Sequence, residues 1–213
     1  MLDSFKKPMK IPLSELRDVT LWAILSYGYT HEEAERIREV LLYAQLRGNN
    51  QGVVKLIGSG IPKSPLAQAI ENQKETKLSA WIHGHQTHAM ITVTYAVEIA
   101  IQKAKEHGIA MVGVHGINTS SGALGYYARK IAEAGLVGFI FAGSMETVAA
   151  EGSFEAILGT NPFAFAVPTT VDPFVFDMAT AAMAYYGVVE ANTAGRVLPE
   201  GIAYDKNGNT TIL

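Results

Sequence analysis

The sequence has no cysteine, no excess of basic residues and no long uninterrupted apolar run within its 213 residues. Without thiols it forms neither disulfides nor zinc–thiolate sites. Because 17 lysines and arginines stand against 20 aspartates and glutamates, we expect no binding to nucleic acid or to anionic membranes. A membrane-spanning helix needs about 18 consecutive apolar residues, so none is expected. The first ten residues carry lysines with no apolar run behind them, which does not fit a signal peptide.

The overall composition of the chain is typical of a globular protein. Hydrophobic residues make up 48% of the chain, enough to bury a core in one large domain or one and a half. No internal repeat occurs, and no G-x-G-x-x-G motif follows a predicted strand, so the Rossmann fingerprint is absent. His83 and His85 form a His-x-His pair, but alternate residues of any strand share a face, so we predict no metal site. A cytoplasmic protein is the expectation, since nothing marks the chain for export.

Residues 1–62 are predicted to form a helical segment. One helix is expected over residues 13–27. Thr30 and Glu33 have the spacing of a capping box, and apolar residues then recur at helical intervals at Ala34, Ile37, Leu41 and Ala44. Residues 49–63 are rich in glycine and proline, which indicates that the chain leaves the helical region there.

Residues 63–213 are predicted to form an α/β domain. The pattern indicates, in order, a strand over 79–83, a helix over 88–107 ended by Gly108, a strand over 109–114, a polar loop over 116–122, a helix over 123–134 and a strand over 136–142. Such alternation is typical of α/β proteins with some parallel strand pairing.

One later stretch combines two strands with a predicted helix start. Leu158-Gly-Thr-Asn-Pro-Phe-Ala-Phe-Ala-Val-Pro168 is followed by a strand over 174–176 and then by Asp177-Met-Ala-Thr180. Asp and Thr are good helix N-caps, and the free N–H groups of a helix start attract anions such as phosphate. Two interpretations stay open: a capped helix in the core, or a nucleotide site.

Several short segments share a family resemblance. They are Leu46-Arg47-Gly48, Gly122-Ala-Leu-Gly-Tyr-Tyr127, Gly135-Leu-Val-Gly138, Gly159-Thr-Asn-Pro162 with Asp177-Met-Ala-Thr180, and Gly195-Arg-Val-Leu-Pro199. In this order they resemble the type II malate/L-lactate dehydrogenases, which include ureidoglycolate and diketogulonate dehydrogenases and are unrelated to the Rossmann-type lactate dehydrogenases. The resemblance covers nearly the whole chain.

The resemblance implies a fold and a reaction. The fold would be a non-Rossmann α/β fold with an N-terminal helical segment and a mixed central sheet that binds nucleotide and substrate. The reaction would be NAD- or NADP-dependent interconversion of a small 2-hydroxy acid and a 2-oxo acid, in a homodimer. Relatives continue past a hairpin such as Asp205-Lys-Asn-Gly208, so we expect the domain to be truncated at its C-terminus.

Substrate-binding and proton-transfer residues follow by position in the resemblance. Arg47 fits the carboxylate-binding role, although an arginine after a helix also complements the helix dipole. Gln51 stands where the family has its first histidine, and Ser120, or Thr119 if the loop carries a gap, stands where it has the second. Glutamine cannot deliver a proton at neutral pH.

Two other histidines could supply the missing acid. His88 and His115 are predicted at junctions between strands and loops, where α/β folds bind ligands, and water ordered by Gln51 and Ser120 is the alternative. For the cofactor, the resemblance points to Ser144, Thr160, Asp177, Met178 and Ala179. Ser144, Thr160 and Asp177 also have a purely local role available in a turn or a cap.

Three functions are therefore weighed. The first is an NAD(P)-dependent oxidoreductase acting on a small carboxylate. The second is a catalytically silent family member that binds a ligand or a partner protein, since both family histidines are replaced. The third is an imine reductase, whose substrate can arrive already protonated and needs no acid.

Overall fold

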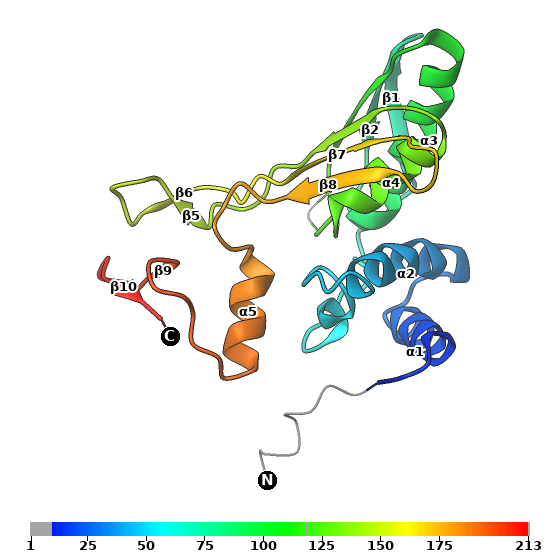
Figure 1. Cartoon of the computed structure of the whole chain (residues 1–213). Coiled ribbons are helices and arrows are strands. Elements are labelled where there is room, and N and C mark those ends of the chain that lie inside the picture. The colour runs from blue at the N-terminus through cyan, green and yellow to red at the C-terminus, as the bar shows by residue number, and fades with distance from the viewer. Residues whose placement is uncertain (1–9, 118, 213) are drawn as a thin grey trace.

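The computed structural model describes residues 10–117 and 119–212. Three parts lie outside the described residues: residues 1–9, Asn118 and Leu213. The signal-peptide argument concerns the first of these, and Asn118 belongs to the predicted polar loop. The chain begins with the helices α1 (Leu13–Ser26) and α2 (His31–Gln45) and the short 3-10 helix η2 (Val53–Leu56). Figure 1 shows these helices packed below an upper layer of strands and helices.

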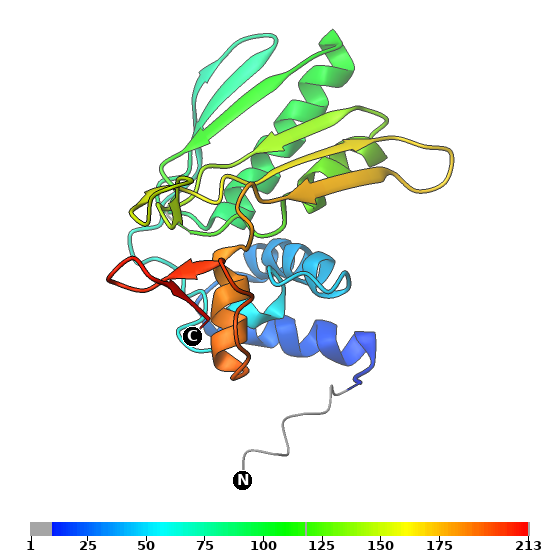
Figure 2. The ribbon, with the colours of Figure 1, turned by 60° about the vertical axis from the view of Figure 1, so that its left-hand side comes forward.

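The upper layer contains two three-stranded sheets. In the first, β2 (Ser79–His83) pairs antiparallel with β1 (Glu71–Glu75) and parallel with β3 (Met111–His115). In the second, β7 (Phe163–Val167) lies between β4 (Gly138–Phe141) and β8 (Phe174–Met178), all antiparallel. Helix α3 (Ala89–His107) packs on β2 and β3, and α4 (Leu124–Glu133) packs on β4, β7 and β8, so both helices cover the same side of the strands (Figure 2). The predicted mixed α/β fold is confirmed.

The remaining elements lie to one side. They are the short pair β5 (Val148–Ala149) and β6 (Ala156–Leu158), helix α5 (Tyr185–Thr193), and the hairpin of β9 (Ala203–Tyr204) and β10 (Thr210–Thr211). The hairpin turn predicted at Asp205 is present, and the Asp205 carboxylate accepts bonds from the backbone N–H groups of Asn207 and Asn209. No helix in the described part of the chain is both long and apolar enough to cross a membrane.

Local signals set the helix ends as the sequence predicts. Thr30 and Glu33 form the capping box at the start of α2. His88 caps α3, and Gly108 ends it with a φ of 86°, a conformation that glycine adopts without steric cost. The main core cluster joins α1, α2, α3, α4 and β7, and its fully buried side chains include Ile24, Ile37, Leu41, Met90, Leu124 and Tyr127. A second, smaller cluster of Ala80, Ile82 and Ala96 lies between α3 and the first sheet.

The helix start predicted at Asp177 is wrong. Strand β8 continues through Met178, and α5 begins only at Tyr185, after Ala184, which provides no side-chain cap. The apolar residues around Asp177 pair with β7, with Asp177 opposite Ala164. A neighbouring strand thus outweighs the capping preference of Asp177, because local propensity gives way to tertiary pairing.

Strand β7 alternates small and large side chains. Ala164 and Ala166 are fully buried against α4, whereas Phe163 and Phe165 point to the opposite side. We call this opposite side the phenylalanine face, formed by Phe139, Phe141, Phe163, Phe165, Phe174 and Phe176, whose rings contact one another at centroid distances of 5.4–6.3 Å. Phe139 is 61% exposed and Phe141 75%, so the described residues leave much of this face uncovered.

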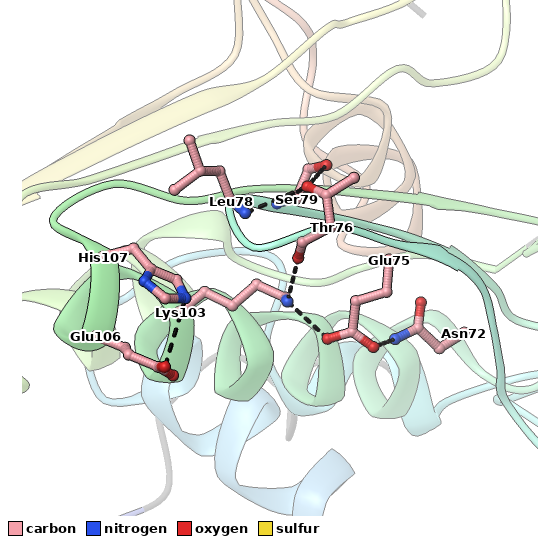
Figure 3. Close-up of polar contacts among 8 residues, drawn as sticks. All are labelled: Asn72, Glu75, Thr76, Leu78, Ser79, Lys103, Glu106 and His107. Carbon is pink, nitrogen blue, oxygen red and sulfur yellow. Dashed lines mark hydrogen bonds and ion pairs between the residues drawn. The ribbon is translucent and has the colours of Figure 1, made fainter.

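A single lysine ties the β1–β2 turn to helix α3. The Lys103 ammonium donates to the Thr76 carbonyl at 2.7 Å and pairs with the Glu75 carboxylate at 2.6 Å (Figure 3). Only 12% of the Lys103 side chain is exposed, against 53% for Glu75. The Thr76 hydroxyl closes the turn by accepting from the backbone N–H groups of Leu78 and Ser79.

We expect Lys103→Met to lower the free energy of unfolding by about 1–2 kcal/mol, since it removes a charge-assisted bond to a carbonyl and a half-exposed ion pair. Urea unfolding measures the change. Lys105→Met, an exposed lysine on the same helix, is the matched control and should change stability by less than about 0.5 kcal/mol. Equal effects of the two changes would contradict a structural role for Lys103.

Candidate functional site

A buried lysine is the most unusual polar group in the structure. Lys55 lies in η2 and is 3% exposed. Its ammonium donates to the Ser120 hydroxyl at 3.0 Å and lies 3.3 Å from the centre of the Tyr186 ring. No carboxylate pairs with it among the residues that the structure describes. Burial lowers the pKa of Lys55 from 10.5 to about 7, because a low-dielectric site disfavours the charged form.

The loop that carries Ser120 is fixed at several points. The Ser120 hydroxyl accepts a second bond from the Gly122 backbone N–H at 3.2 Å. The Thr119 hydroxyl accepts from the Ala89 N–H at 2.7 Å, and the Tyr127 hydroxyl donates to the Ser121 carbonyl at 2.6 Å. The loop is therefore held against the start of α3 and against α4, and Ser120 faces Lys55.

His88 lies in the same buried region, at the N-cap of α3. Its Nδ1 accepts from the Met90 N–H at 3.2 Å, and the residue is 3% exposed. Burial, together with the nearby Lys55 charge, lowers the pKa of His88 to about 4. A histidine of this kind is neutral at pH 7, which argues against His88 as a proton donor there.

Gln51 lies just before η2. Its side-chain amide donates to the Asn50 side-chain carbonyl at 3.1 Å, and its backbone N–H donates to the Asn49 side chain at 2.9 Å. A Cβ placed on Gly187 would come within 3.0 Å of the Asn50 amide. The loop before η2 therefore packs against the start of α5, close to the ring of Tyr186 that covers Lys55.

Arg47 lies in a different cleft. Its guanidinium stacks on the Tyr43 ring at 3.8 Å and donates to the Tyr43 carbonyl at 3.1 Å. The cleft has a volume of about 340 Å³, and its lining residues are Tyr43, Arg47, Asn49, Arg129, Pro173, Val175 and Asp177. A second cavity of about 510 Å³ lies beside the β9–β10 hairpin, far in sequence from the predicted site residues.

Asp177 contacts the start of helix α4, which is distant from it in the sequence. Its carboxylate accepts from the Gly125 backbone N–H at 2.7 Å, in the first turn of α4, where a negative charge is favourable. Burial raises the pKa of Asp177, although the Gly125 bond opposes the rise. Its neighbour Met178 points to the other side of β8, where it is 41% exposed. The two side chains therefore face different environments.

His115 belongs to a cluster of rings at the ends of β2 and β3. The His83 ring lies 3.8 Å from that of His85 and 4.6 Å from that of His115. His115 Nε2 bonds the Gln73 side chain at 2.9 Å, and His85 Nε2 bonds Glu71 at 2.9 Å. Desolvation, and then the neighbouring histidines, lower the pKa of His83. No group of three or more His, Asp or Glu side chains in the described ranges is arranged to hold a metal ion.

Two of the predicted cofactor residues lie together. The Ser144 hydroxyl is 3.0 Å from that of Thr160 and accepts from the Thr160 N–H at 2.7 Å. Thr180 also reaches this place, donating through its N–H and its hydroxyl to the Thr160 carbonyl. A Cβ on Gly159 would collide with the Ser144 carbonyl at 2.5 Å, so the turn requires glycine. Exposed hydroxyls of this kind suit a ribose or a carboxamide.

The sequence reasoning missed Lys55. The available signal was a charged residue inside the apolar run Val53-Val-Lys-Leu-Ile57, which begins two residues after Gln51. Lysine is almost never fully buried unless it is paired, but a sequence does not show which lysine is buried. Only the packing of η2 under α5 and against the Ser120 loop distinguishes Lys55 from an ordinary surface lysine.

The arrangement defines a mixed α/β protein outside the Rossmann class, with a buried polar site between its helical part and its sheets. A profile of the malate/L-lactate dehydrogenase family matches residues 11–212, and the chain belongs to this family. The malate dehydrogenase of Pyrococcus abyssi is 33% identical over 211 residues, covering 95% of this chain and 57% of that protein.

Two further relatives show the range of the family. A Delta(1)-pyrroline-2-carboxylate/Delta(1)-piperideine-2-carboxylate reductase of Pseudomonas putida is 32% identical over 212 residues, 95% of this chain and 61% of the reductase. The solved structure of a dehydrogenase from Sinorhizobium meliloti matches with a TM-score of 0.85 at 26% identity, covering 96% of this chain and 61% of that one. The family predicted from the sequence motifs is confirmed, and the chain spans about three-fifths of the length of these relatives.

The buried Lys55 predicts a pH-dependent stability. An unfolded lysine titrates near 10.5 and the folded one near 7, so between these values the unfolded chain binds more protons and the free energy of unfolding rises with pH. Lys55→Met should remove this rise, which amounts to at most about 1.4 kcal/mol per pH unit. Urea unfolding of both proteins between pH 6 and 9.5 measures the difference; parallel curves would contradict a lowered pKa for Lys55.

Proposed function

We propose that the chain is an NAD- or NADP-dependent oxidoreductase that interconverts a small 2-oxo acid and the corresponding 2-hydroxy acid. Its family membership supports an oxidoreductase. The observation that carries the proposal is Lys55, a buried cation that has no carboxylate partner in the described part of the chain. A buried charge without a counter-ion is costly, and binding a small carboxylate there relieves that cost.

The chemistry of a 2-oxo acid suits this place. Its keto oxygen and its carboxylate lie on adjacent carbons, so one ammonium group can face both. The Ser120 hydroxyl, 3.0 Å from the Lys55 ammonium, then lies within reach of the keto oxygen. In an alternative arrangement, Arg47 rather than Lys55 binds the substrate carboxylate, as the sequence predicts. The substrate then extends toward the cleft that Arg47 shares with Asp177.

The cofactor is proposed to contact the Ser144 and Thr160 hydroxyls, with Met178 and Ala179 beside them and Asp177 on the far side of β8. A bound nicotinamide supplies or accepts the hydride. The site fits such a group, since the neighbouring Ser144 and Thr160 hydroxyls can bond a ribose or a carboxamide. A cytoplasmic location remains a prediction of the sequence.

An imine reductase is the second candidate, because the reductase of Pseudomonas putida covers the same 95% of this chain. A cyclic imine that carries a carboxylate presents the same anionic group to Lys55. It differs in the proton requirement, because an imine can bind already protonated.

The first test is a titration of the chain with NADH and NADPH, followed by nicotinamide fluorescence, and then turnover with small 2-oxo acids and cyclic imine carboxylates. We expect saturable binding and turnover, with a loss of about 100-fold or more in kcat/KM for Lys55→Met. Lys77→Met, an exposed lysine in the β1–β2 turn, is the control. Absent cofactor binding at millimolar concentration would support the catalytically silent alternative instead.

We also propose a homodimer. The phenylalanine face supports it, because exposed apolar patches of this kind mark interaction sites. Light scattering at micromolar concentration should give twice the mass of the chain, and the double change Phe139→Glu and Phe141→Glu should give the single mass. Val171→Glu, at a residue that is 90% exposed in the β7–β8 connection, should leave the dimer intact. A well-folded parent monomer would contradict the proposal.

A further inference from the structure

We propose that Ser120 and Lys55 form a proton relay: the Ser120 hydroxyl gives its proton to the substrate oxygen, and the buried Lys55, hydrogen-bonded to Ser120, replaces that proton. The inference rests on the proposed function, since it assumes a 2-oxo or 2-hydroxy acid beside Lys55. It goes further by naming the source of the proton in a chain that lacks both family histidines.

The hydrogen bonds around Ser120 leave one proton free. Its oxygen accepts from the Lys55 ammonium at 3.0 Å and from the Gly122 N–H at 3.2 Å. A hydroxyl has two acceptor lone pairs and one donor, so both lone pairs are engaged. The Ser120 O–H has no acceptor within the described ranges, and it is therefore available to a ligand.

The neighbouring groups do not compete for this role. His88 uses Nδ1 to cap α3 and is neutral at pH 7, since its pKa is lowered to about 4. The Gln51 amide donates to Asn50 and carries no proton that it can release. His115 lies in the ring cluster, bonded to Gln73. Ser120, by contrast, is hydrogen-bonded to a titratable ammonium group, that of Lys55, which can replace its proton.

Lys55 is suited to supply the proton. Burial brings its pKa to about 7, and a group that titrates near the working pH is the most effective proton donor and acceptor. The titratable groups near it are His88 at the start of α3 and Tyr186 on α5. Tyr27, the residue after α1, contacts η2 through its hydroxyl, which donates to the Leu56 carbonyl. Helix α2 presents the uncharged Gln45, which bonds the Val53 N–H.

The proton balance closes in both directions. In reduction, the hydride that a bound reduced nicotinamide would supply adds to C2 of the 2-oxo acid, the carbonyl π bond breaks toward oxygen, and that oxygen takes the proton of Ser120. Ser120 takes a proton from the Lys55 ammonium, and the neutral Lys55 amine is reprotonated by hydronium or buffer acid from the solvent. Oxidation reverses each transfer, so it requires Lys55 to be neutral at the start.

The test compares Lys55→Arg, Ser120→Ala and the parent in kcat/KM for reduction between pH 5.5 and 9. The parent rate should fall as pH rises through about 7, because the protonated Lys55 is needed. Lys55→Arg keeps the charge but does not titrate, so we expect a loss of about 10²–10⁴-fold and no fall near pH 7. Ser120→Ala should lose a similar factor, and Lys77→Met should behave as the parent.

A second readout is independent of activity. NMR of chains carrying ¹³C- and ¹⁵N-labelled lysine, with the Lys55 signal assigned by its loss in Lys55→Met, should show Lys55 titrating near 7. Titration above 9 overturns the relay even if the variants are inactive. Parent-like rates and pH profiles in Lys55→Arg or Ser120→Ala overturn the relay and leave the proposed function standing. A parent that binds the cofactor but turns over none of the substrates overturns both.

Discussion

The close contact of Gly122 with α2 and α3 is the constraint on which the site depends. Gly122 has a φ of 76°, and a Cβ there would lie 2.6 Å from Val40 and 3.1 Å from Met90. The loop carrying Ser120 can therefore rest directly on the core, and the Gly122 N–H bonds the Ser120 hydroxyl. Any larger residue would push the loop away from α2 and from η2, which follows α2 and carries Lys55.

The same contact explains how a lysine can stay buried. On burial, the Lys55 ammonium loses its hydration and gains contacts with the Ser120 hydroxyl and the face of the Tyr186 ring. The loss of hydration lowers the pKa of Lys55. Burying a charge without a counter-ion destabilises the folded protein. Such a loss of stability is common at sites that must bind a ligand. Asp177 shows the opposite solution, since the first turn of α4 offers its buried carboxylate a backbone donor.

The sequence resemblance places different residues at the two positions where this family is expected to have histidines. Glutamine and serine stand where the resemblance implies histidines, and the two remaining candidate histidines are a buried helix cap and a member of a ring cluster. A serine recharged by a lysine would perform the same proton transfer with different donors. The chain spans about three-fifths of the length of these relatives, and the phenylalanine face is largely exposed among the described residues.

The sequence by itself determined the local structure and the family. The capping box at Thr30, the end of α3 at Gly108 and the hairpin turn at Asp205 were predicted because each depends on residues a few positions apart. The motifs around Thr160 and Asp177 predicted the family, but they did not show that Asp177 lies in a strand. Strand pairing and the capping of α4 by Asp177 join residues far apart in the chain, so only the tertiary structure decided them. The same holds for Lys55, whose burial and contact with Ser120, 65 positions away, arise only when η2, α5 and the Ser120 loop pack together.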